Sequence, residues 1–132
     1  MDRVLVRAAL GAVMLAAVTP ASALASPGPV ADAAAGRGVF ASQCSSCHSD
    51  ARSRPALIGP PLFGVVGRPA GSIAGFAYST TMKHAGFAWT PDRLRAYLPA
   101  PQRYLPGVKM TYPGLKSPQQ LDQLIAYLGS LK

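Results

Sequence analysis

Residues 44–48 read Cys-Ser-Ser-Cys-His, and this stretch contains the only two cysteines of the 132-residue chain. Two cysteines at this spacing occur in thioredoxin-like redox pairs and in zinc sites. The redox pair requires a strand–helix–strand context, which the flanking residues do not show. A zinc site needs two further ligands, and the only histidines are His48 and His84. The histidine directly after the second cysteine favours a third interpretation.

The pattern C-x-x-C-H is the attachment signal for c-type haem. On a helical turn, positions i, i+3 and i+4 lie on one face, which brings Cys44, Cys47 and His48 together. The two thiols can add to the two vinyl groups at one edge of a porphyrin, and the imidazole can reach the iron. We therefore expect one covalently attached haem c, with a disulfide or a zinc site as the alternatives.

The second axial ligand of the iron decides what such a haem can do. Met110, Met82 and His84 are the candidates after the N-terminal segment. Four prolines stiffen the loop around Met110: Pro99, Pro101, Pro106 and Pro113. We expect Met110 to be the ligand, because a stiff loop can hold a weak thioether–iron bond, and Met82 has no comparable bracing. A thioether raises the reduction potential, and six-coordinate iron has no open position, which favours one-electron transfer over catalysis.

The first 25 residues have the features of a secretory signal peptide. Arg3 and Arg7 form a basic start, an uncharged apolar stretch follows, and small residues precede Ser26. We expect cleavage after Ala25, which leaves a mature domain over residues 26–132 in the bacterial periplasm, an oxidising compartment. An uncleaved membrane anchor is the alternative, but the apolar stretch is short for a span of ~20 residues.

The composition indicates one small domain without long regular elements. Hydrophobic residues make up 49% of the chain and charged residues 14%, which argues against disorder. Glycine and proline, at 13 each, argue against a long helical bundle, and the lack of apolar alternation argues against a sandwich or barrel. We expect an all-α domain of short helices joined by ordered loops.

Three segments carry helix-start signals. Asp32 can cap a helix that runs to about Gln43. Thr90, followed by proline, opens a second helix that ends before Pro99. Ser117, also followed by proline, opens a third, whose apolar residues recur at helical spacing: Leu121, Leu124, Ile125 and Leu128.

The net charge is +8, from 13 Lys and Arg against 5 acidic residues, none of them glutamate. The mature chain would keep +7. The basic residues are scattered and form no Lys- and Arg-rich run of the kind that binds the phosphates of nucleic acids. An acidic protein partner is therefore favoured over nucleic acid. We expect a monomer that has no stable membrane insertion after signal cleavage.

Further motifs flank residues 44–48, namely Gly36-x-x-x-Phe40, Gly59-Pro60, Gly64-Val65-Val66-Gly67-Arg68, Gly75-Phe76-Ala77-Tyr78-Ser79, Trp89, Tyr97-Leu98, Tyr104-x-Pro106-Gly107-x-Lys109-Met110, Gly114-Leu115-Lys116 and Leu124-Ile125-Ala126-Tyr127-Leu128. With these motifs the chain resembles class I cytochrome c of the mitochondrial type, including the soluble bacterial electron carriers. The resemblance runs from about Gly36 to Leu131. It implies a cytochrome c fold, in which three main helices and ordered loops wrap around a covalently bound haem.

The resemblance also assigns roles around the iron. Cys44 and Cys47 would carry the thioether bonds, and His48 and Met110 would be the proximal and distal ligands. Pro60 would accept a hydrogen bond from the His48 Nδ1–H, which orients the ring and increases its donor strength.

Four other residues are implied to support the haem. Tyr78, Trp89 and Arg68 would serve its buried propionates. Tyr97 would lie near the Met110 sulfur.

Taken together, these features predict a periplasmic monohaem electron carrier that is not an enzyme. Arg103, Lys109 and Lys116 would lie near the exposed haem edge and steer acidic redox partners. Two alternatives stay open: an electron-transfer subunit of a periplasmic dehydrogenase, and a haem sensor or weak peroxidase with a labile methionine ligand.

Overall fold

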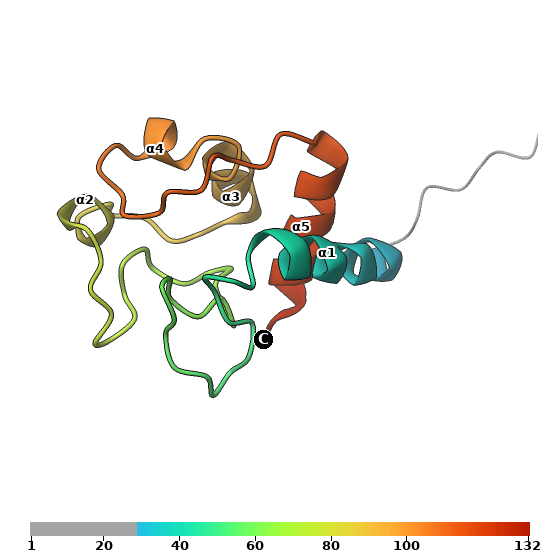
Figure 1. The fold of residues 1–132 in the computed structure, drawn as a ribbon, viewed down its shortest axis with the longest axis horizontal. Coiled ribbons are helices and arrows are strands. Elements are labelled where there is room, and N and C mark those ends of the chain that lie inside the picture. Colours follow the sequence, from blue (N-terminus) through green and yellow to red (C-terminus); the bar gives the residue numbers. More distant parts are fainter. Residues whose placement is uncertain (1–28) are drawn as a thin grey trace, which may run out of the picture.

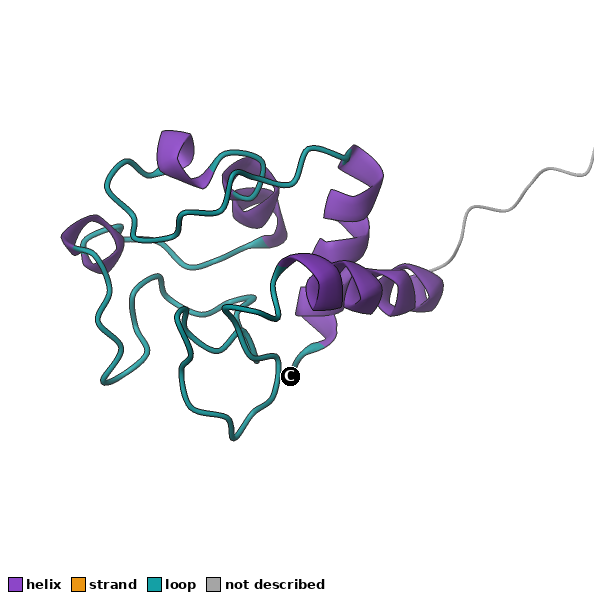
Figure 2. Cartoon of the chain, in the orientation of Figure 1, coloured by secondary structure: helices purple, strands orange, loops and turns teal. Residues whose placement is uncertain are grey.

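The computed structural model describes residues 29–132, so the predicted signal peptide and its cleavage site lie outside the described residues. The helices follow one another as α1 (Pro29–Gln43), α2 (Thr80–Lys83), α3 (Pro91–Tyr97), α4 (Pro101–Tyr104) and α5 (Pro118–Ser130). Within this range no strand forms, and the only sheet-like feature is one antiparallel bridge between Pro69 and Ala88. A long loop over residues 44–79 joins α1 to α2, and shorter loops join the remaining helices (Figure 2). The predicted all-α fold is confirmed, with α1, α3 and α5 as the longer helices.

Helices α1 and α5 cross in close contact and form one end of the molecule (Figure 1). Gly36 of α1 lies directly on α5, because a Cβ atom there would overlap the carbonyl of Gln123 and approach Tyr127 Cβ to 2.7 Å. One turn later, the Phe40 ring packs on the Tyr127 ring with a centroid separation of 5.8 Å. Any side chain at position 36 would push the two helices apart. The 44–48 motif follows α1 directly, so this packing fixes where the motif begins relative to α5.

The helix ends follow the sequence signals, with one exception. Ser117 Oγ accepts a hydrogen bond from the Gln120 N–H at 3.3 Å, and Thr90 Oγ1 accepts one from the Arg93 N–H at 3.2 Å. The expected cap at Asp32 is wrong, because α1 already begins at Pro29. Proline suits the first helical position, and Asp32 then lies in the first turn, where its charge still favours the helix dipole.

The apolar face of α5 holds the other elements in place. Five of its side chains are buried: Leu121, Leu124, Ile125, Tyr127 and Leu128. The Tyr127 hydroxyl also donates to Asp50 Oδ2 at 2.6 Å, and burial, reinforced by this hydrogen bond, raises the pKa of Tyr127 to about 12. The hydroxyl thus stays a donor at neutral pH and ties the segment after His48 to α5.

Candidate functional site

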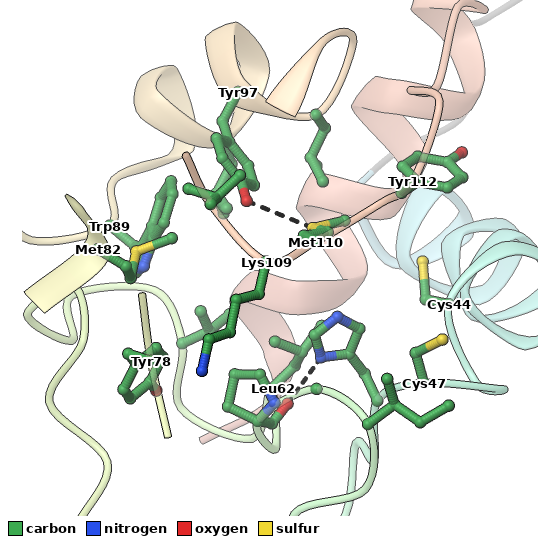
Figure 3. A pocket seen from close by; sticks show the side chains of 18 of the residues that line it. Cys44, Cys47, Leu62, Tyr78, Met82, Trp89, Tyr97, Lys109, Met110 and Tyr112 are labelled. Carbon is green, nitrogen blue, oxygen red and sulfur yellow. Dashed lines mark hydrogen bonds between the residues drawn. The ribbon is translucent and has the colours of Figure 1, made fainter. Parts of the chain in front are cut away.

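A cavity of about 390 Å³ lies between the loops and the inner faces of α3 and α5. Its lining includes every site residue predicted from the sequence: Cys44, Cys47, His48, Pro60, Arg68, Tyr78, Trp89, Tyr97 and Met110. Figure 3 shows Cys44 and Cys47 on one side of the space, Tyr78 and Trp89 on the opposite side, and Met110 between them. Residues that span 67 positions of the chain are thus brought together around one space.

The two cysteines lie on a turn that continues α1. Cys44 N–H donates to the Phe40 carbonyl at 2.8 Å, and the N–H groups of Cys47 and His48 both donate to the Cys44 carbonyl, at 3.0 and 2.9 Å. Both thiols are free and partly buried. Burial, with a smaller contribution from Cys47, raises the pKa of Cys44 to about 11. The turn presents both sulfurs and the imidazole from one short segment.

The His48 ring is fixed by its neighbours on the next loop. Its Nδ1 lies 2.7 Å from the Pro60 carbonyl oxygen. Because a carbonyl can only accept, Nδ1 carries the proton and Nε2 keeps its lone pair. Burial lowers the pKa of His48, against the opposing influence of the Pro60 hydrogen bond. The ring is therefore held neutral, in the tautomer that leaves Nε2 available to a metal.

Close approach of Gly59 completes this arrangement. A Cβ atom at Gly59 would lie 2.6 Å from His48 Nδ1 and would overlap the rest of the ring. Gly59 N–H in turn donates to the Cys47 carbonyl at 2.8 Å. In the sequence, the Gly59-Pro60 pair is only one motif of a family resemblance. The room that Gly59 leaves for the His48 ring is visible only in the fold.

Met110 enters the cavity from the loop that follows α4. The Tyr97 hydroxyl donates to Met110 Sδ at 3.4 Å. Tyr97 is buried, which raises its pKa to about 12, so that its hydroxyl remains protonated at neutral pH. An edge-on contact with the Trp89 ring, at 4.8 Å between centroids, fixes the Tyr97 ring in turn. The thioether is thus held in place by a donor that is itself rigidly packed.

Arg68, Tyr78 and Trp89 provide the polar part of the wall. The Arg68 guanidinium donates to the Phe63 and Pro61 carbonyls, at 2.9 and 2.8 Å, and has further N–H groups besides these. Burial lowers its pKa against the opposing effect of Tyr78, but an arginine remains charged throughout the accessible pH range. A cation, a phenol and an indole N–H together suit an anionic group.

The other two ligand candidates are placed differently. Met82 lines the cavity on α2 and packs against the core, as expected for a methionine that fills space. His84 is exposed and its Nδ1 donates to the Thr80 carbonyl at 2.9 Å. His84 does not line the cavity.

These residues fit a c-type haem. Two thiols stand on one turn, a neutral imidazole offers Nε2, and a thioether projects from a separate loop into the same mostly apolar space. Imidazole and thioether are the ligand pair of electron-carrying cytochromes. The part of the wall formed by Arg68, Tyr78 and Trp89, the cationic corner of the cavity, suits the carboxylates of a haem. A closed zinc site does not fit, because no cluster of three or more His, Cys, Asp or Glu forms within residues 29–132.

Comparisons with known proteins agree with this fit. The cytochrome c family model matches residues 33–132. Cytochrome c2 of Rhodopila globiformis is 43% identical over 104 residues, which cover 79% of this chain and 97% of that protein. Cytochrome c of Guizotia abyssinica is 42% identical over 100 residues, which cover 76% of this chain and 90% of that protein. The solved structure of cytochrome cH from Methylobacterium extorquens superposes with a TM-score of 0.69 at 40% identity, covering 75% of this chain and 98% of that one.

Proposed function

This chain belongs to the cytochrome c family, whose members carry one covalently attached haem c and transfer electrons, and we propose that it is an exported carrier with His48 and Met110 as iron ligands. The observation that carries the ligand assignment is the shared cavity, into which a fixed neutral imidazole and a positioned thioether both project. The thioether bonds would be formed by Cys44 and Cys47.

The bound haem would supply a ferric–ferrous couple for one-electron transfer. The protein's contribution is to keep the surroundings of that couple unchanged. The Pro60 carbonyl holds the His48 ring, Tyr97 holds the Met110 sulfur, and most of the surrounding wall is apolar. Groups that are already in place need little rearrangement when the charge changes, which lowers the barrier to electron transfer.

Arg68, Tyr78 and Trp89 would hold the carboxylates of the haem at the cationic corner of the cavity. Arg68 is half-buried, and pairing its charge with these anions would offset the cost of removing either charge from water alone. The same three residues thereby help to set the orientation of the group.

Export to the periplasm is proposed from the sequence of residues 1–25. A basic start followed by an apolar stretch and small residues is typical of a cleavable signal. Within residues 29–132, no helix has the length and apolarity needed to cross a bilayer.

The native ferrous protein is expected not to bind carbon monoxide at neutral pH, because Met110 would occupy the remaining axial position. The measurement is the visible spectrum of the reduced holoprotein before and after addition of carbon monoxide. A spectral change in the native protein would instead favour the sensor or weak peroxidase. Stable co-purification with an enzyme subunit would favour the dehydrogenase subunit.

Reversing one charge at the proposed partner-facing surface is expected to change electron-exchange rates according to the charge of the reactant. Arg103 is the suitable position, because it is exposed, whereas Lys109 also donates to the Ala77 carbonyl at 2.6 Å and supports the loop. Arg103→Glu should slow reduction of ferricyanide several-fold at low salt, and speed the reaction with the cationic hexaammineruthenium. The difference should fade as the Debye length shortens to ~3 Å near 1 M salt.

Arg54→Glu is the matched control for this experiment. It makes the same change of charge at another exposed arginine, on the loop over residues 50–58. Equal effects of the two variants would show that only the overall charge matters. Equal rates for Arg103→Glu and the native protein at low salt would contradict steering altogether.

A further inference from the structure

The segment that presents Met110 is held almost without main-chain hydrogen bonding. Within the described part of the chain, no bond between two main-chain groups involves residues 109–114. The flanking bonds are those from Val108 N–H to the Leu105 carbonyl, at 3.3 Å, and from Leu115 N–H to the Leu98 carbonyl, at 3.0 Å. The position of Met110 must therefore depend on side chains that reach this segment.

Gln102 of α4 makes two such contacts with one amide group. Its Nε2 donates to the Val108 carbonyl at 2.7 Å and to the Met110 carbonyl at 2.8 Å. A primary amide carries two N–H donors, so both bonds can form at once. The two carbonyls belong to residues on either side of Lys109, and holding both restricts rotation of the backbone between them.

We propose that Gln102 is a positioning residue for the axial ligand, and that its amide clamps the main chain of Met110 so that the thioether stays on the iron. This inference rests on the proposed ligation by Met110. The clamp joins the ligand-bearing loop to α4, which follows three residues after α3 and its last residue, Tyr97.

The other side chains that reach this loop act at different points. Tyr97 contacts the sulfur itself, at 3.4 Å, and Lys109 Nζ donates to the Ala77 carbonyl at 2.6 Å. The Tyr112 hydroxyl donates to Gln43 Oε1 of α1 at 3.2 Å. Gln102 is the side chain that bonds to the main chain of Met110. Its loss should allow the loop to swing outward while α3, α5 and the His48 side of the cavity stay in place.

The test compares imidazole binding by the ferric holoproteins of the native chain, Gln102→Glu and Gln102→Met. Imidazole can bind only when Met110 has left the iron, so its affinity reports how often the loop opens. Glutamate keeps the shape of glutamine but presents no donor at neutral pH, and methionine keeps the length without the charge. Both variants should bind imidazole about tenfold more tightly, which corresponds to about 1.4 kcal/mol.

Gln119→Glu is the matched control, because Gln119 is exposed on α5, away from this loop, and its variant should bind imidazole as the native protein does. Unchanged affinity in both Gln102 variants overturns the inference, whatever happens to their stability towards urea. Tighter binding in Gln102→Glu alone also overturns it, because repulsion by the carboxylate would then be the cause. Failure of the ligation itself is recognised separately, because Met110→Ala would then leave the oxidised spectrum unchanged.

Discussion

Met110→Ala is expected to abolish the methionine–iron charge-transfer band of the oxidised holoprotein and to lower its reduction potential. Alanine removes the sulfur to which the Tyr97 hydroxyl donates, and nothing else at position 110 can bind iron. A neutral thioether favours ferrous iron, so its replacement by water favours the ferric state. Axial ligation spans roughly 0.8 V among haem proteins, and we expect a shift on the order of hundreds of millivolts. The measurements are the visible spectrum and a redox titration.

Met82→Ala is the matched control for this prediction. Both methionines line the same cavity and the same atoms are removed, but Met82 lies on α2 and packs against the core. This variant should keep the band, with a cost in stability only. Loss of the band in Met82→Ala and its persistence in Met110→Ala would assign the ligand to Met82 and refute the proposed site.

The short-range features of the molecule could be predicted because their causes are local. The spacing of residues 44–48 determines which side chains share a turn, and Ser117 and Thr90 cap helices through bonds to residues three positions away. The resemblance also named nine residues far apart in the chain as haem-binding, and all nine line the cavity. Local patterns could not have grouped them, since none relates Trp89 to Cys44.

The features that could not be predicted arise from close approach in space. Only glycine at position 59 leaves room for the His48 ring. The Gln102 amide bonds to the carbonyls of Val108 and Met110, which lie six and eight residues further along the chain. In the sequence, Gln102 is merely a neutral residue beside Arg103. The start of α1 differs from the expectation for another reason: Asp32 and Pro29 both suit a helix start, and the sequence does not rank them.

Without haem, the chain is expected to be largely unfolded. Much of the core faces the cavity: Val65, Leu94, Tyr97, Leu98, Leu124 and Leu128 are all buried and all line it. Leaving about 390 Å³ unfilled would cost on the order of 10 kcal/mol at the rate observed for engineered cavities, which is comparable to the whole stability of a small domain. The double variant Cys44→Ala/Cys47→Ala, which cannot attach the group, should therefore lose most of the helical circular dichroism of the native holoprotein.

The single variant Cys44→Ala distinguishes the effect of losing one cysteine sulfur from the effect of losing the haem. It retains Cys47 and His48, so a fraction that still carries haem should keep the native helical signal, and the colourless fraction should not. The helical signal should therefore follow the haem content rather than the number of cysteines. A colourless double variant that unfolds cooperatively on heating would contradict this prediction, because the polypeptide would then bury enough apolar surface by itself. The packing of α1 on α5 through Gly36 and Phe40 is the part that would have to supply it, since it is the most extensive contact between helices within residues 29–132.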